Sequence, residues 1–238
     1  MKLTVIVPTL NEAEHLAGAL ESIPHGAEII VSDGGSTDET AAISARYGAR
    51  LVTGDKGRAV QMNRGAQRAT GDVVLFLHAD CALGPNAMSA LEAALSEDDV
   101  VGGSFRMAVR DKRRALRWIA AAANARARYL RTPYGDQALF VRRRSFEAIG
   151  GFPEIPFMED VAFVRALKRR GKLVCVPATV STGVRHWQRL GPAATTLLNW
   201  SMVILFLLGV SAERLEPHYR RWRRADPTPK SEKAFSAP

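Results

Sequence analysis

The first hundred residues alternate short β-branched runs with amphipathic segments, and this order constrains the fold more than any other feature of the chain. The hydrophobic periodicity predicts strands over 3–7, 28–32, 50–52 and 73–77. Helices are predicted between and after them, over 11–23, 36–47, 59–70 and 86–96. An alternating strand–helix order indicates a mainly parallel sheet with helices on its faces. We therefore predict an α/β fold.

Two of these helices begin with a capping-box pattern. Asn11 is followed three residues later by Glu14, and Ser36 is followed by Glu39. In a capping box the first side chain accepts a hydrogen bond from the first turn of the helix, and the second side chain bonds back to the cap. We expect Asn11 and Ser36 to be helix N-caps.

The second half of the chain is less regular. Strands are predicted over 100–107, 137–141 and 173–176, and helices over 113–130, 145–149 and 160–170. Residues 191–216 are expected to form an apolar C-terminal helix. The polar, proline-punctuated residues 217–238 are expected to form a mobile basic tail.

The composition is that of a globular chain with a basic surplus. Hydrophobic residues make up 47% of the 238 and charged residues 24%, which excludes a disordered chain. The net charge of +9 predicts a negatively charged partner, such as a phosphate-bearing ligand, an anionic membrane or nucleic acid. Two cysteines are too few for a disulfide framework, and the apolar run before Pro8 is too short for a signal peptide. We expect a cytoplasmic location.

Polar side chains and tight-turn residues follow three of the predicted strands, over 8–12, 33–36 and 78–80. In open α/β sheets, ligands bind beyond the carboxyl ends of the strands. In an extended chain His78 and Asp80 would point to the same side, with Ala79 turned away. A carboxylate beside an imidazole suits Mn²⁺ or Mg²⁺, which would help a diphosphate to leave. The alternative is that His78 bonds a backbone carbonyl and Asp80 caps the next turn.

Asp33 stands just past a predicted buried strand and before two glycines. Its carboxylate could accept hydrogen bonds from a base imide or from ribose hydroxyls. A turn followed by a helix cap would account for residues 36–39 but not for Asp33, so we favour a ligand contact for Asp33.

Two adjacent carboxylates, Glu159 and Asp160, begin another predicted helix. A helix N-terminus favours the ionised form that a general base needs, and N-terminal capping is the alternative. Residues 134–137 could bind an acceptor hydroxyl or stabilise a turn. Arg58 and Asn63 could contact phosphates or face solvent.

Taken together, these segments resemble family 2 glycosyltransferases with the GT-A fold. The resemblance runs from residue 1 to about 220 and is carried, in order, by residues 5–12, 30–38, 77–80 and 158–160. A closer likeness is to a small cytoplasmic subgroup labelled arsenosugar-biosynthesis glycosyltransferases. That likeness is carried by residues 56–63, 134–137 and 185–187.

The resemblance implies a GT-A domain over 1–190, with a nucleotide-sugar half (1–100) and an acceptor half (101–190). It places these residues at the nucleotide, usually a uridine diphosphate: Pro8, Thr9, Asn11, Glu12, Asp33, Arg58, Asn63, His78, Ala79 and Asp80. Asp160, with Glu159 beside it, would be the general base of an inverting transfer. The residues implied at the acceptor are Gly135, Asp136, Gln137 and Trp187.

The resemblance also implies a divalent metal, Mn²⁺ or Mg²⁺, held with the diphosphate by Asp80. His78 stands where the common Asp-x-Asp motif has its first Asp. His186 stands where the subgroup tends to have Arg, so it is either a third metal ligand or a surface substitution.

The apolar run 197–210 is shorter than the roughly 20 residues that a membrane-spanning helix needs. It could pack on the domain, form a homodimer contact, or lie at the inner face of the membrane beside basic residues. The expected partners are a nucleotide sugar and a small-molecule or lipid acceptor, and not nucleic acid.

Three other functions fit the sequence less well than a glycosyltransferase does. A sugar-nucleotide nucleotidyltransferase would carry a Gly-rich, basic loop after the first strand, where this chain has residues 8–12. A Rossmann dehydrogenase would carry a G-x-G-x-x-G motif there. A non-enzymatic binder of anionic surfaces would not place carboxylates at its strand ends, because they repel phosphate unless a metal intervenes.

Overall fold

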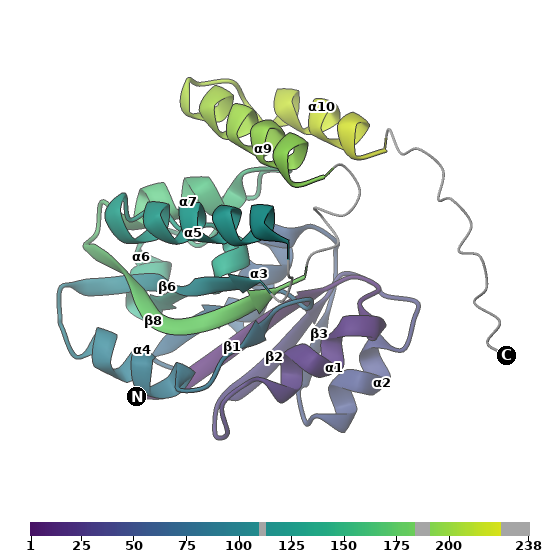
Figure 1. Ribbon diagram of the computed structural model, residues 1–238. Coiled ribbons are helices and arrows are strands. Elements are labelled where there is room, and N and C mark those ends of the chain that lie inside the picture. The colour runs from purple at the N-terminus through teal and green to yellow at the C-terminus, as the bar shows by residue number, and fades with distance from the viewer. Residues whose placement is uncertain (110–112, 184–190, 225–238) are drawn as a thin grey trace, which may run out of the picture.

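The computed structural model describes residues 1–109, 113–183 and 191–224 and has one eight-stranded sheet, in the order β3-β2-β1-β4-β7-β6-β8-β5 (Figure 1). The strands are β1 Leu3–Thr9, β2 Glu28–Asp33, β3 Arg50–Thr53, β4 Val73–Phe76, β5 Ala82–Leu83, β6 Val100–Val109, β7 Leu139–Arg142 and β8 Lys172–Thr182. Parallel pairs join β1 to β2 and β4, β2 to β3, and β6 to β8, whereas β7 and β5 run antiparallel to their neighbours. The predicted mixed, mainly parallel α/β fold is confirmed.

Helices cover both faces of the sheet. They are α1 Ala13–Glu21, α2 Thr40–Arg46, α3 Arg58–Gln67, α4 Ala87–Leu95, α5 Arg114–Tyr129, α6 Arg143–Ala148, α7 Glu159–Leu167, α9 Pro192–Leu207 and α10 Ala212–Arg224, with a 3₁₀ turn, η1, over Gly135–Gln137. Apolar side chains of α1, α2 and α4 form one core with the sheet, and those of α3, α6 and α7 form a second core. In Figure 1, α9 and α10 lie beyond α5, on the opposite side of the molecule from α1 and α2.

Strand β1 shows why the sequence forms a sheet that is buried on both faces. Val5 and Val7 enter the core with α1, and Ile6, between them, enters the core with α3. Successive side chains of a strand point to opposite faces, so a strand covered on both sides must be apolar at every position. The run Leu3–Val7 meets that requirement except at Thr4, whose hydroxyl donates to Glu28 Oε2 at 2.5 Å.

Both predicted capping boxes are wrong. Asn11 has a positive φ of 55°, and its Oδ1 accepts from the amide of Thr37 at 2.9 Å, so it caps nothing in α1. The amide of Ala13, the first residue of α1, instead donates to Asp38 Oδ2 at 3.0 Å. Ser36 lies four residues before α2 begins, and its hydroxyl donates to Asp33. Asp38 therefore accepts from the first amide of both helices, since the amide of Thr40 donates to its Oδ1 at 3.0 Å. The local pattern could not show that the cap of α1 comes from a loop 25 residues away.

The C-terminal prediction also needs correction. The single apolar helix expected over 191–216 ends at Leu207, and the chain turns at Gly209, which has a φ of 98°. Residues 217–224, expected in the tail, belong to α10. The physical reason is packing, because Leu215 is 4% exposed and Tyr219 stacks on Phe157 with ring centroids 4.4 Å apart. Residues 225–238 lie outside the described residues.

No helix within residues 1–109, 113–183 and 191–224 is long and apolar enough to cross a membrane.

Gly103 in β6 leaves no room for a side chain between the neighbouring strands β7 and β8. A Cβ at Gly103 would lie 2.0 Å from the carbonyl oxygen of Val174 and 2.8 Å from Phe140 Cζ. We expect Gly103→Ala to lower the free energy of unfolding by about 3 kcal/mol, the upper part of the usual overpacking range. Urea denaturation measures this change.

The matched control is Gly18→Ala in α1, where a Cβ meets no described atom within 4 Å. This change should raise the free energy of unfolding by about 0.5–1 kcal/mol, since alanine is the better helix former. Equal effects of the two substitutions would contradict the packing described here.

Candidate active site

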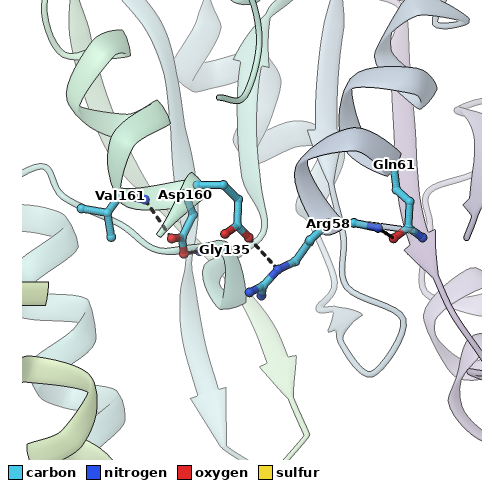
Figure 2. A network of polar contacts seen from close by, with 7 residues as sticks. Arg58, Gln61, Gly135, Asp160 and Val161 are labelled. Carbon is cyan, nitrogen blue, oxygen red and sulfur yellow. Dashed lines mark hydrogen bonds and ion pairs between the residues drawn. The ribbon is translucent and has the colours of Figure 1, made fainter. Parts of the chain in front are cut away.

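An ion pair joins the first residues of two helices that lie 101 positions apart in the sequence. Arg58 Nε at the start of α3 lies 2.6 Å from Glu159 Oε1 at the start of α7. The Glu159 side chain is 3% exposed and that of Arg58 is 49% exposed. Figure 2 shows Arg58 directed from α3 toward the segment that carries Asp160. The pair therefore connects the expected nucleotide half to the expected acceptor half.

The charges of this pair depend on each other. Burial raises the pKa of Glu159, and the nearby Arg58 guanidinium opposes that rise. Burial would lower the pKa of Arg58, but the Glu159 and Asp160 carboxylates hold it above its usual value. A buried carboxylate without such a partner would be strongly destabilising. Arg58, expected at a phosphate, is thus engaged by a carboxylate.

Asp160 is held by two backbone amides. Its Oδ2 accepts from the amide of Gly135 at 2.9 Å, and its Oδ1 accepts from the amide of Val161 at 2.8 Å (Figure 2). Met158, just before α7, has a φ of 65°, a left-handed conformation that sets the direction in which the helix begins. The carboxylate is half-buried and fixed in orientation, and it is not an N-cap of α7, since it belongs to the second residue of that helix.

His78, just past the end of β4, also lies beside Gly135 and Asp160. A Cβ at Gly135 would be 3.0 Å from His78 Nε2 and 3.4 Å from Asp160 Oδ2, so glycine allows these groups to meet. His78, Arg58, Gly135, Glu159 and Asp160 line one small cavity. Burial, followed by the charge of Arg58, lowers the pKa of His78 to about 4, so the imidazole is neutral at pH 7.

Asp80 faces a different cavity from His78. The chain does not stay extended after β4 but turns, with the amide of Cys81 donating to the carbonyl of His78 at 3.0 Å. Asp80 then lines a cavity of about 260 Å³ with His15, Ser181 and Gly183. The extended geometry that we expected, with both side chains on one side, is therefore not observed. Ala79, between them, is buried.

Two of the residues expected at the acceptor, Asp136 and Gln137, differ in how their side chains are hydrogen-bonded. Asp136 Oδ1 is buried and has no hydrogen-bond partner among the residues that the structure describes. Burial raises the pKa of Asp136 to about 6, and Arg126 opposes the rise. Gln137 is fully buried, and its Oε1 accepts from Arg126 Nη2 at 3.1 Å, which is a structural role. Asp136 therefore has a free acceptor atom for a ligand among the described contacts, whereas the side chain of Gln137 is used within the protein.

Both oxygens of the Asp33 carboxylate accept hydrogen bonds from its own loop or from Thr9 of β1. Its Oδ2 accepts from the amides of Gly35 and Ser36 at 2.9 and 2.8 Å, and its Oδ1 accepts from Thr9 Oγ1 at 3.0 Å and from the Ser36 hydroxyl. Burial raises its pKa, but these hydrogen bonds outweigh burial and lower the pKa below its usual value. Asp33 is 5% exposed. The structure therefore gives this residue a loop-organising role that the sequence did not predict.

Three side chains of α3 bond the backbone of distant segments, two of them at strand ends and one in the loop before α7. Gln61 Nε2 donates to the carbonyls of Thr9 and Ser32 at 2.7 and 3.0 Å. Asn63, expected at a phosphate, exchanges two hydrogen bonds with the backbone of Phe152, at 2.8 and 2.9 Å. Arg64 Nη2 donates to the carbonyl of Asp33 at 2.7 Å. Sequence reasoning missed these roles because the partners are distant in the chain.

The remaining expected residues are placed as follows. Pro8 and Glu12 are half-buried and Asn11 is exposed, all at the carboxyl end of β1. Trp187 and His186 lie outside the described residues. Within the described ranges, no group of three or more His, Cys, Asp or Glu side chains could hold a metal ion.

We expect Asp33→Asn to lower the free energy of unfolding at pH 7 by about 2–3 kcal/mol, because hydrogen bonds to an ionised group are lost. A carboxylate with a lowered pKa stabilises the fold above its unfolded pKa, near 3.9, and this stabilisation is lost as the pH falls through the folded pKa. The difference between variant and parent should therefore shrink below about pH 4. Urea unfolding at pH 7 and pH 3 measures it.

The exposed Asp98 provides the control. Asp98→Asn should change stability by less than about 0.5 kcal/mol at either pH. If Asp33→Asn were equally mild at pH 7, the loop-organising role of Asp33 would be wrong.

Comparison with known proteins identifies the family. Residues 4–150 match the family described as Glycosyl transferase family 2. An uncharacterized glycosyltransferase of Mycobacterium tuberculosis is 36% identical over 106 residues, which are 44% of this chain and 49% of that protein. A PGL/p-HBAD biosynthesis glycosyltransferase of Mycobacterium bovis is 35% identical over 164 residues, 63% of this chain and 62% of that protein. The match thus spans about half to three fifths of these relatives.

Solved structures show the same fold. Glucosyl-3-phosphoglycerate synthase from Mycobacterium tuberculosis superposes with a TM-score of 0.63 at 20% identity, over 88% of this chain and 80% of that one. A mannosyltransferase from Pyrobaculum calidifontis superposes with a TM-score of 0.62 at 22% identity, over 88% and 65%. The fold is that of GT-A glycosyltransferases, as the resemblance implied. The chain belongs to glycosyl transferase family 2.

Proposed function

We propose that this protein is a glycosyltransferase that moves a sugar from a nucleoside diphosphate sugar, preferably a UDP-sugar, to a hydroxyl group of an acceptor, with inversion. The observation that carries the proposal is the meeting of Arg58, His78, Gly135, Glu159 and Asp160 beyond the carboxyl ends of the strands. Donor chemistry in structures of the same fold supports it. Staphylococcus aureus TarS was solved with UDP and with UDP-GlcNAc, and the Pyrobaculum enzyme with GDP-Man and Mn²⁺.

Asp80 is proposed as the protein ligand of a divalent cation. Mg²⁺ and Mn²⁺ are commonly held by one or two carboxylates together with substrate phosphates, so a single carboxylate at the donor is a sufficient protein ligand. Burial raises the pKa of the neighbouring Cys81 thiol, so that thiol stays neutral and is a poor ligand. His186 is proposed as a further ligand. The ion, when bound, neutralises charge on the departing diphosphate.

Asp160 is proposed as the general base. Its carboxylate takes the proton of the acceptor hydroxyl while the hydroxyl oxygen bonds to the anomeric carbon and the bond from that carbon to the diphosphate oxygen breaks. The two backbone amides hold the carboxylate in one orientation. Glu159 is proposed as a positioning residue, since it binds Arg58 and fixes the start of α7. Attack from the face opposite the diphosphate inverts the anomeric configuration.

The acceptor side is proposed to include Gly135 and Asp136, where one carboxylate oxygen is unpaired in the described part of the chain. Membership of the arsenosugar-biosynthesis subgroup is a further proposal, supported by residues 56–63 and 134–137.

Asp160→Asn separates donor binding from transfer. UDP with Mn²⁺ should raise the melting temperature of parent and variant equally, and by more than either ligand alone, because both proteins bind the donor. Release of UDP from UDP-glucose, UDP-galactose or UDP-GlcNAc, with water replacing the acceptor hydroxyl, should fall about 10²–10⁴-fold in the variant. Differential scanning fluorimetry and a UDP-release assay measure the two effects.

Asp80→Asn is the matched control, since it should lose the Mn²⁺-dependent part of the thermal shift. UDP release that survives Asp160→Asn would show that Asp160 is not the base. A parent protein whose melting temperature no nucleoside diphosphate changes, with or without Mn²⁺, would contradict the donor assignment.

A further inference from the structure

A groove of about 790 Å³ runs between α5 and α9, next to the candidate active site. Its walls are apolar, with Trp118, Ile119 and Ala122 from α5 and Trp200, Val203 and Ile204 from α9. The volume lies within the usual range for ligand pockets, about 300–1,000 Å³. The apolar walls distinguish it from the charged cavity around Arg58 and Glu159.

Polar residues also line the groove, and two of them, Tyr134 and Asp136, flank Gly135 of the candidate active site. Arg126 lines the groove as well. Arg126 is already engaged, because its guanidinium stacks 3.5 Å above the Tyr134 ring and its Nε donates to the carbonyl of Thr132 at 2.8 Å. Asp136 Oδ1 is a buried carboxylate oxygen without a hydrogen-bond partner among the described residues. Asp136 directly follows Gly135, whose amide holds Asp160.

The walls are unusually exposed for large apolar side chains. Trp118 is 76% exposed, Trp200 is 56% and Ile204 is 54%. The opposite side of α9 is occupied, because Leu198 and Met202 pack on Met158 and Val161. An exposed apolar surface with a defined hollow marks a binding site more often than a scattered residue does.

We propose that this groove binds the apolar body of the acceptor, so that the acceptor is an amphiphile whose hydroxyl group lies at Asp136 and Asp160. The inference rests on the proposed transfer to a hydroxyl and names the acceptor's chemical class. Continuity with Asp136 and Gly135 favours an acceptor over a membrane surface or a second copy of the chain. Either of those would cover the rim without supplying a hydroxyl to the buried oxygen of Asp136.

Primary alcohols test the groove without any donor. Hexanol, octanol and decanol are titrated into the full chain, and tryptophan fluorescence is followed because Trp118 and Trp200 line the walls. The dissociation constant should fall about fourfold for each added methylene group that enters the groove. Affinity that does not change with chain length would overturn the proposal.

Two adjacent exposed alanines of α5 give matched variants, since Ala122 lines the groove and Ala121 is not among its lining residues. Ala122→Phe should weaken decanol binding at least tenfold, and Ala121→Phe should leave it unchanged. Asp136→Ala should weaken it about tenfold through loss of the hydroxyl contact. Equal effects of the two phenylalanines would overturn the proposal.

The proposed transfer is checked separately in the same variants. Ala122→Phe should keep the thermal shift with UDP and Mn²⁺. A retained shift shows that the groove alone has changed. A lost shift would show that the substitution has damaged the fold or the donor site. Anionic phosphatidylglycerol vesicles that bind the parent and Ala122→Phe equally, while no alcohol binds, would assign the apolar surface to a membrane and overturn the acceptor assignment.

Discussion

The arrangement of the site depends on a carboxylate that is almost completely buried. The Glu159 side chain is 3% exposed and needs a permanent cation beside it. Removing the partner would leave a buried, unpaired charge, which is strongly destabilising. Arg58 supplies that cation from the other half of the chain. The pair fixes the start of α7 relative to the start of α3, and Asp160, the next residue, is thereby placed against Gly135.

The direction of the strands explains why these segments meet. Strands β1, β2 and β4 run parallel and end at one edge of the sheet. Strand β7 runs antiparallel to β4, so the residues that precede β7, including Gly135 and Asp136, arrive at that edge as well. The same edge leads into the groove between α5 and α9. One topological feature therefore supports the transfer site and the acceptor site that we propose.

Much of this could be predicted from residue patterns, and the limits have physical causes. The strand–helix alternation predicted the sheet, and polar residues at strand ends predicted the edge at which the candidate site lies. Local patterns failed where a distant partner decides, as with Asp38 capping α1 and Gln61 joining Thr9 to Ser32. The turn after β4, which separates His78 from Asp80, has no marker in residues 78–81. The helix α10 is stabilised by packing of Leu215, which polarity and prolines concealed.

The central claim is that the Arg58–Glu159 pair couples the two halves of the site. A double-mutant cycle with Arg58→Met, Glu159→Gln and the double variant tests it most directly. We predict that the single changes lower the free energy of unfolding and that the double change costs less than their sum, with a coupling energy of about 1–3 kcal/mol. The fold-decrease in UDP release of the double variant should likewise be smaller than the product of the fold-decreases of the two single variants. Additive effects on both stability and UDP release would contradict the account.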